Sequence, residues 1–213
     1  MSLEEIREQN IKLVVEKALY CFREHGIEKT KVMDIAKAAG LTERSIFRYF
    51  ETKADIVQAA AYLFWSQTLE RVSGEVKAAD IGEMSGIDQV RKLLSVYSNL
   101  YFDDPKGIRF TLDAEVALYN AGKSLGRDKQ VINRPPEPYE ISSSPLVLAI
   151  HKGLEDGTVN PKGDVKELYY NAYDSILGVM QRIALGTTSA TDLDNRARMR
   201  NLCEMFVMAF QGG

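Results

Sequence analysis

The chain has 213 residues, of which 45% are hydrophobic and 27% charged, and its formal net charge is −3. This length allows one ordinary domain or two small ones, with a core that needs no metal or disulfide for stability. Two cysteines and two histidines exclude a disulfide scaffold and argue against a histidine-rich metal site. We therefore expect no metal and no cofactor.

The apolar runs are far shorter than the roughly 20 residues that a membrane span requires. The first ten residues, MSLEEIREQN, carry three glutamates and no apolar block, unlike a signal peptide. These features predict a cytoplasmic protein with no membrane partner.

The hydrophobic pattern predicts an all-α fold, because strand-like alternation is not sustained anywhere in the chain. Apolar residues three and four apart predict a first group of helices over 4–24, 31–38, 43–49 and 53–78. A polar connector is expected at 79–87 and a long loop at 122–142, where glycine and proline gather. The remaining helices are expected over 88–102, 106–121, 143–156, 164–186 and 192–211, with Asp192 as the cap of the last.

The first three helices have the order of a helix-turn-helix motif, with Gly40 in the turn and Thr42 as the cap of the third helix. In such a motif the later helix lies in the major groove of DNA, and residues near its N-terminus reach the base edges. Residues 29–53 carry six lysines and arginines against three acids. A local basic patch on an acidic chain therefore predicts a double-stranded DNA partner, with a solvated helical surface as the alternative.

The exposed side chains at the start of the third helix suit base recognition. Arg44 can form two hydrogen bonds with guanine, Glu43 can accept one from cytosine, and Ser45 can bond to either kind of edge. Glu43 could instead stabilise only the positive end of the helix. The predicted base contacts are Thr42, Glu43, Arg44, Ser45 and Arg48. Lys31 and Lys53, near helix starts, are predicted to contact phosphate.

The segment VMDIAKAAGLTERSIFRYFETKADI resembles the recognition region of the TetR family of bacterial transcriptional regulators. The matching positions are Asp34-Ile35-Ala36, Ala39-Gly40, Thr42, Ile46-Phe47-Arg48-Tyr49-Phe50 and Lys53. VVEKALYCFREHG at 14–26 is similar to the first helix of that family. The resemblance is close over residues 11–60. It implies a helix-turn-helix DNA-binding domain at 1–52 and a helical ligand-sensing and dimerisation domain at 53–213.

Two departures from the family pattern concern phosphate contacts. Phe47 stands where the family usually has a tyrosine that binds phosphate, so Tyr49 is the alternative contact. Lys31 stands where the family commonly has a capping serine or threonine. Either Thr30 takes over the cap, or the cap is absent and Lys31 binds phosphate. The predicted phosphate contacts are Thr30, Lys31, Phe47, Tyr49 and Lys53.

The second part of the chain is rich in tyrosine, which suits a mixed small-molecule pocket. The resemblance implies such a pocket among the middle helices, and plain helix packing is the alternative for each candidate. The candidate lining residues are Trp65, Tyr97, Tyr101, Arg109, Tyr119, Tyr173 and Met180. The last two helices carry more apolar residues than one buried stripe needs, which predicts a homodimer. The candidate interface residues are Met180, Ile183, Leu202, Met205, Phe206 and Phe210.

The sequence thus predicts a ligand-responsive regulator that binds a near-palindromic operator as a dimer and is released by a small molecule. Members of the family usually repress transcription, and activation of transcription is the alternative. A DNA-binding helical dimer without an effector is a second alternative. The sequence has no phosphate-binding glycine loop, no zinc-protease motif and no nucleophile elbow, so we expect no catalytic residues.

Overall fold

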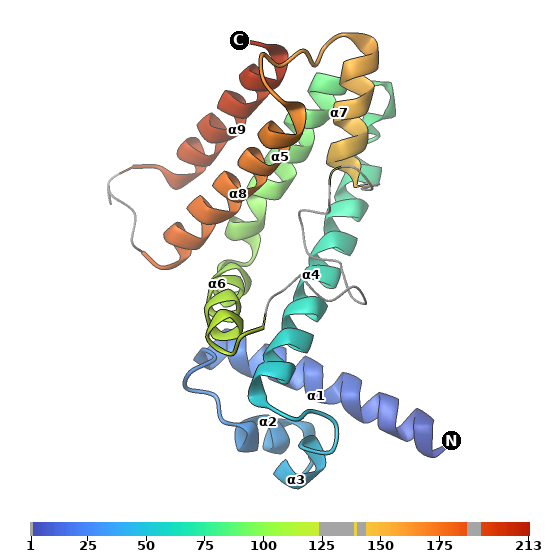
Figure 1. The fold of residues 1–213 in the computed structure, drawn as a ribbon, viewed down its shortest axis with the longest axis vertical. Coiled ribbons are helices and arrows are strands. Elements are labelled where there is room, and N and C mark those ends of the chain that lie inside the picture. Colours follow the sequence, from blue (N-terminus) through green and yellow to red (C-terminus); the bar gives the residue numbers. More distant parts are fainter. Residues whose placement is uncertain (1, 124–138, 140–143, 187–192) are drawn as a thin grey trace. The chain divides into compact units, whose positions relative to one another are not determined.

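The computed structural model describes residues 2–123, 139, 144–186 and 193–213, apart from the side chain of Tyr101. These residues form nine α-helices and one short 3-10 helix, with no strand among them (Figure 1). The all-α prediction is confirmed. Most of the loop predicted at 122–142 lies outside the described residues.

No helix in the described part of the chain is both long and apolar enough to span a membrane.

The chain divides into two compact units by its internal contacts. Unit 1 contains the described residues of 1–67 and 106–134, and unit 2 contains those of 68–105 and 135–213. Helix α6 (Pro105–Asn120) therefore belongs to the unit that holds the N-terminal helices. The division into a DNA-binding part before residue 53 and a sensing part after it concerns function, and it stays a prediction.

Unit 1 is built from the N-terminal helices, the first part of α4 and α6. Helix α1 (Leu3–His25) starts with a reciprocal cap, in which Ser2 and Glu5 each accept the backbone N–H of the other. The core of unit 1 centres on three aromatic rings from three helices. Phe110 of α6 lies 6.2 Å from Phe22 of α1 and 6.0 Å from Phe64 of α4 between ring centroids. Helix α6 is thus packed into the core of unit 1 through Phe110.

The other helices of unit 1 are α2 (Val32–Ala39), α3 (Glu43–Ile46) and the first part of α4 (Lys53–Ala78). The predicted bounds of α4, 53–78, agree with the observed ones. The structure adds a cap at its start, where Thr52 and Asp55 each accept the backbone N–H of the other.

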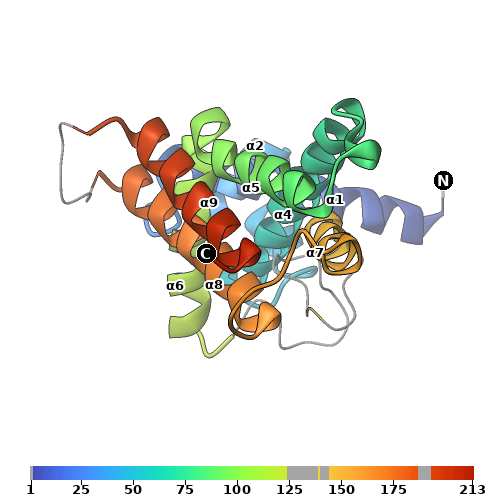
Figure 2. The same cartoon turned by 90° about the horizontal axis from the view of Figure 1, so that it is seen from above.

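Unit 2 contains α5 (Gly86–Asp103), α7 (Pro145–Asp156), α8 (Val165–Ala184) and α9 (Asn195–Gln211), with the 3-10 helix η1 at Ile81–Glu83. Helices α5, α8 and α9 pack side by side, and α7 packs against α5 (Figure 2). The predicted Asp192 cap of α9 is wrong: Asp194 accepts the N–H of Arg196 at 2.9 Å, and the helix begins after it.

The start of α5 lies directly against the end of α7. A Cβ atom on Gly86 would overlap the backbone of Gly153, and one on Gly153 would overlap the side chain of Val159. The Asp156 carboxylate accepts the N–H of Gly86 at 2.7 Å, and the Thr158 hydroxyl accepts the N–H of Ile87 at 3.0 Å. These bonds supply partners for amides that have none within the helix. The corner therefore depends on residue 86 having no side chain.

The same hydrogen bonds perturb Asp156. Bonds from the Thr158 hydroxyl and from the N–H groups of Gly86 and Thr158 hold the pKa of the Asp156 carboxyl below its ordinary value. The carboxylate therefore remains ionised, and remains an acceptor for α5, over a wider range of pH than a free aspartate would.

Candidate nucleic-acid interface

The turn between α2 and α3 is built on Gly40, as predicted. Gly40 has a φ of 66°, in the left-handed region, which glycine adopts at little cost. The N–H of Leu41 donates to the carbonyl of Ala36 at 2.9 Å, and that of Gly40 to Lys37 at 3.2 Å. This pair of bonds ends α2 and redirects the chain into α3.

Thr42 caps α3, which confirms the prediction for that residue. Its Oγ1 accepts the N–H of Ser45 at 3.1 Å. The cap sets the N-terminal turn of α3 immediately after the Gly40 turn. Unit 1 therefore contains a helix-turn-helix at α2–α3.

Helix α3 is shorter than predicted. It covers Glu43–Ile46, and residues 47–49 form turns rather than the helix expected to residue 49. The N–H groups of Arg48 and Tyr49 donate to carbonyls three residues back, at Ser45 and Ile46. These bonds are typical of a tightened final turn, which helical spacing in the sequence does not distinguish from an α-helix.

The predicted base contacts surround this short helix. Thr42, Glu43, Arg44 and Arg48 are exposed, and Ser45 is half-buried. The Thr42 and Ser45 hydroxyls lie 2.8 Å apart and bond to each other, while Ile46 is fully buried beneath them. The turn thus holds Arg44 and Glu43 outward over a packed base, which suits direct contact with base edges.

The predicted phosphate contacts divide into two groups. Lys31 is exposed at the cap position of α2, where it makes no side-chain cap and its N–H donates to Asp34 at 2.8 Å. Thr30 is only 1% exposed and its hydroxyl donates to the carbonyl of Gly26 at 2.8 Å. Two alternatives were open for the start of α2, a cap by Thr30 or no side-chain cap. The structure has no side-chain cap there. Because Thr30 is buried and its hydroxyl is bonded within the protein, we do not propose it as a phosphate contact.

The two aromatic candidates differ in what they offer a phosphate. Phe47 is 47% exposed, but its ring has no hydrogen-bond donor. Tyr49 is half-buried, and its hydroxyl accepts from the Asn10 side chain at 3.2 Å. The Tyr49 proton is not used by that bond, so Tyr49 can still donate to an anion. It stays the better candidate of the two.

Lys53, in the first turn of α4, is tied to the loop before α2. Its Nζ donates to the carbonyl of Ile27 at 2.5 Å, and the residue is half-buried. An ammonium group has three donors, so one bond to Ile27 leaves others for a phosphate. Sequence reasoning gave Lys53 only the second of these roles.

We expect Lys53→Ala to weaken binding to all DNA sequences alike, because a phosphate contact carries no sequence information. The slope of log affinity against log salt should flatten by about 0.9, the contribution of one neutralised phosphate. Titration of duplex DNA at several salt concentrations measures this slope. A lower affinity with an unchanged slope would leave Lys53 only its role at Ile27, and thermal denaturation would show the size of that role.

The predicted pocket residues are distributed over both units. In unit 2, Tyr97 of α5 and Tyr173 of α8 lie with ring centroids 6.1 Å apart, and Met180 is buried. In unit 1, Trp65 packs edge-on against Phe64. Arg109 and Tyr119 are exposed on α6, Tyr119 to 82%. Because both side chains are exposed, we do not propose them as pocket residues. The side chain of Tyr101 lies outside the described part of the chain.

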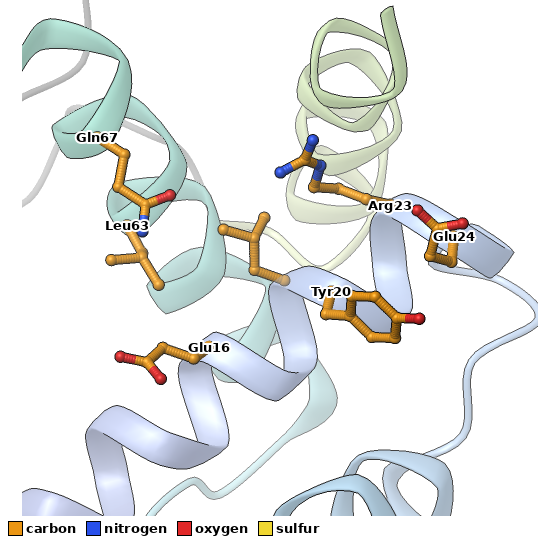
Figure 3. A pocket seen from close by; sticks show the side chains of 7 residues that line it. Glu16, Tyr20, Arg23, Glu24, Leu63 and Gln67 are labelled. Carbon is orange, nitrogen blue, oxygen red and sulfur yellow. The ribbon is translucent and has the colours of Figure 1, made fainter. Parts of the chain in front are cut away.

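A groove that sequence reasoning missed lies in unit 1. Its volume is about 290 Å³, and none of the predicted pocket residues lines it. Figure 3 shows its lining from α1 and α4, which consists of Glu16, Leu19, Tyr20, Arg23, Glu24, Leu63 and Gln67. Glu16, Arg23 and Glu24 look in the sequence like the solvated side of an amphipathic helix, so no signal there points to a groove.

The predicted dimer residues also divide into two groups. Met180, Ile183 and Phe210 are buried within unit 2, so its own core accounts for their apolar character. Leu202 and Phe206 are half-buried, and Met205 is 65% exposed. Met208, which was not in the predicted set, is 59% exposed one turn further along α9.

Comparison with known proteins gives one family and several related folds. Residues 14–60 match the family described as bacterial regulatory proteins, tetR family. Comparison with curated protein sequences gives no match.

Among solved structures, the chain is similar to the transcriptional regulator FadR from Bacillus subtilis in complex with stearoyl-CoA, with a TM-score of 0.61 and 17% identity over 93% of this chain and 98% of that one. It is similar to RolR in complex with resorcinol, with a TM-score of 0.63 and 14% identity over 98% and 91% of the two chains. The ketosteroid transcriptional regulator KstR2 of Mycobacterium tuberculosis gives a TM-score of 0.59 and 16% identity over 95% of both chains. At identities of 14–17%, this likeness concerns the fold alone.

Proposed function

Because the chain belongs to the TetR family of bacterial regulatory proteins, we propose that this transcriptional regulator is a dimeric repressor with a small-molecule effector. In this proposal two chains bind a near-palindromic operator and block transcription. An effector then favours a state of the dimer that no longer fits the operator.

The observation that carries the proposal is the surface around α3. Thr42, Glu43 and Arg44 are exposed on its first turn, above the fully buried Ile46. Side chains that combine donors and acceptors on a packed helix start can distinguish base pairs in the major groove. Lys31 and Lys53 supply positive charge near the starts of α2 and α4 for the phosphates on either side.

Dimerisation is supported by the outer side of α9. Met205 and Met208, three residues apart, lie on one side of that helix and are both exposed. Half-buried Leu202 and Phe206 lie beside them. We propose that these four side chains pack against the same residues of a second chain, since a two-fold interface pairs one surface with itself. Two recognition helices would then lie about 34 Å apart, one turn of DNA.

We expect Met205→Glu to dissociate the dimer. Each interface would receive two buried carboxylates without partners, and the dissociation constant should rise about 100-fold or more. Sedimentation velocity over a range of concentrations measures this change. Leu148→Glu is a matched control, because Leu148 is 55% exposed on α7 of the same unit. Loss of the dimer in the control and not in Met205→Glu would place the interface at α7.

The effector is proposed to bind in unit 2, beside the paired rings of Tyr97 and Tyr173 and the buried Met180. Aromatic rings with polar tips suit a ligand that combines an apolar body with a few polar groups. The similar structures of FadR and RolR hold stearoyl-CoA and resorcinol, and each of these ligands combines an apolar part with polar groups. Both compounds are therefore useful first probes.

A thermal shift measurement tests effector binding. A ligand at about 100 times its dissociation constant adds about 2.7 kcal/mol to stability, which raises Tm by about 5–10 °C for a chain of this length. Release also requires that the ligand bind the DNA-free state more tightly, and a coupling of about 3 kcal/mol would lower operator affinity about 150-fold. If DNA binding is specific but no compound in a broad metabolite panel shifts Tm, the alternative of a dimer without an effector is favoured.

A further inference from the structure

Helix α6 contacts the other helices of unit 1 through an ion pair near each of its ends, as well as through Phe110. Near its start, Lys106 Nζ lies 2.5 Å from Glu24 Oε2 in the last turn of α1. Beyond its end, Lys123 Nζ pairs with Oδ1 of Asp55 in the first turn of α4. The two lysines thus connect α6 to the helices that come before and after the helix-turn-helix.

The backbone holds Lys123 in place at the end of α6. Gly122 has a φ of 68°, the left-handed conformation that ends many helices. The N–H of Lys123 donates to the carbonyl of Leu118 at 2.8 Å, and that of Gly122 to Tyr119 at 3.0 Å. These two bonds form the paired pattern of a glycine-terminated helix. The backbone of Lys123 is therefore fixed at a position from which its side chain reaches Asp55.

The Asp55 carboxylate has a separate oxygen for each of its two partners. Its Oδ2 accepts from the N–H and the hydroxyl of Thr52, both at 2.7 Å, and the Thr52 hydroxyl accepts the N–H of Asp55 at 3.2 Å. This is the reciprocal cap that starts α4. Oδ1 is bonded to Lys123. Loss of Lys123 would therefore leave the cap complete and remove only the link to α6.

Solvent screens this ion pair only in part. The side chains of Lys123 and Asp55 are 35% and 25% exposed, less than those of the Arg7–Glu4 and Arg91–Asp88 pairs. Burial raises the pKa of the Asp55 carboxyl, but the hydrogen bonds from Lys123 and Thr52 outweigh it and the net pKa lies below the ordinary value. The carboxylate is thus charged at neutral pH.

The turn that Lys123 holds also contains Lys53, which donates to the carbonyl of Ile27 in the loop before α2. Any shift of this turn would move both the Lys53 ammonium and its attachment to that loop. We propose that Lys123 is a positioning residue for DNA binding, which holds the first turn of α4 so that Lys53 and the α2–α3 motif can contact the phosphate backbone together. This inference rests on the proposed function.

The experiment compares five variants with the wild type, the Asp55→Asn single variant among them, on the duplex that the wild type enriches most from a random pool. Lys123→Met should weaken binding about five-fold, as expected for loss of one partly exposed ion pair, and Lys123→Arg should retain affinity. In an Asp55→Asn background, Lys123→Met should cause no further loss, because the partner is already gone. Lys162→Met, which removes an exposed lysine in unit 2, is the control and should bind like the wild type.

The salt dependence distinguishes positioning from direct contact. A lysine that itself touches phosphate contributes about 0.9 to the slope of log affinity against log salt, so a positioning residue should leave the slope unchanged. Wild-type affinity in Lys123→Met would overturn the inference. So would a flattened slope together with an undiminished loss in the Asp55→Asn background.

Hydrogen exchange of residues 50–57 in the free protein gives a readout that needs no DNA. Exchange there should be faster in Lys123→Met than in the wild type and in Lys162→Met, and equal rates would overturn the holding role. If the wild type enriches no duplex, the proposed function fails, while the exchange measurement still decides whether Lys123 holds the turn.

Discussion

Arg44→Ala is expected to abolish most of the preference of this protein for its best DNA site. Arg44 is exposed on the first turn of α3, after the Thr42 cap and above the fully buried Ile46. A guanidinium placed there can form two hydrogen bonds with guanine. Loss of such a pair costs about 1–3 kcal/mol on the preferred site, a factor of about 5–150, and much less on unrelated DNA.

Fluorescence anisotropy with the preferred duplex and with a scrambled duplex measures the effect of Arg44→Ala. Lys37→Ala is the matched control, because Lys37 is an exposed cation of the neighbouring helix α2. It removes the same charge without a predicted base contact and should keep the ratio of the two affinities. An equal loss on both duplexes in Arg44→Ala would show that Arg44 acts only as a charge.

Gly86→Ala is expected to produce the largest loss of stability. Alanine normally stabilises a helix relative to glycine, by up to about 1 kcal/mol. At residue 86 the added Cβ would overlap the backbone of Gly153, and backbone cannot rotate away as a side chain can. Overpacking of this kind costs about 1–3 kcal/mol or more. The start of α5 would also move away from its acceptor, Asp156.

Thermal denaturation measures the effect of Gly86→Ala, which should lower Tm by about 5–10 °C for a loss of 2–3 kcal/mol in a chain of this length. Gly74→Ala is the matched control, because a Cβ at residue 74 of α4 meets nothing within 4 Å. It should be neutral or slightly stabilising. A Tm for Gly86→Ala at or above that of the wild type would mean that the α5–α7 corner adjusts without cost.

Local signals in the sequence were sufficient for the helix-turn-helix. Gly40 and the Thr42 cap depend on neighbours within a few residues, so turn and capping chemistry predicted them correctly. The length of α3 was overestimated, because the tightened turn after Ile46 keeps nearly the same spacing of apolar residues as an α-helix.

Contacts between distant segments were not predictable. Gly86 was assigned to a connector, because nothing near it in the sequence shows that Gly153 packs against it. Lys123 and Asp55 are 68 residues apart, and in the sequence each looks like an ordinary charged surface residue. Thr30 was a candidate for phosphate binding, but the fold buries its hydroxyl against the end of α1. In each case the three-dimensional packing determines the role, and a single sequence carries no record of it.

Apolar residues in the later helices gave an ambiguous signal for the same reason. Ile183 and Phe210 were assigned to a dimer interface, and both are buried in the chain's own unit 2. Met205 has a similar character in the sequence but is 65% exposed. A helical pattern shows that a residue needs an apolar partner, but the partner can lie in the same chain or in another one.

The ratio of affinities for two DNA duplexes tests sequence recognition by α3 most directly. One duplex is the most enriched sequence from a random pool, and the other is the same sequence scrambled, both at moderate salt. We expect the enriched sequence to be near-palindromic and to bind about 1,000-fold or more tightly than its scrambled form. A ratio close to one for the folded protein would contradict sequence-specific recognition by Thr42, Glu43 and Arg44.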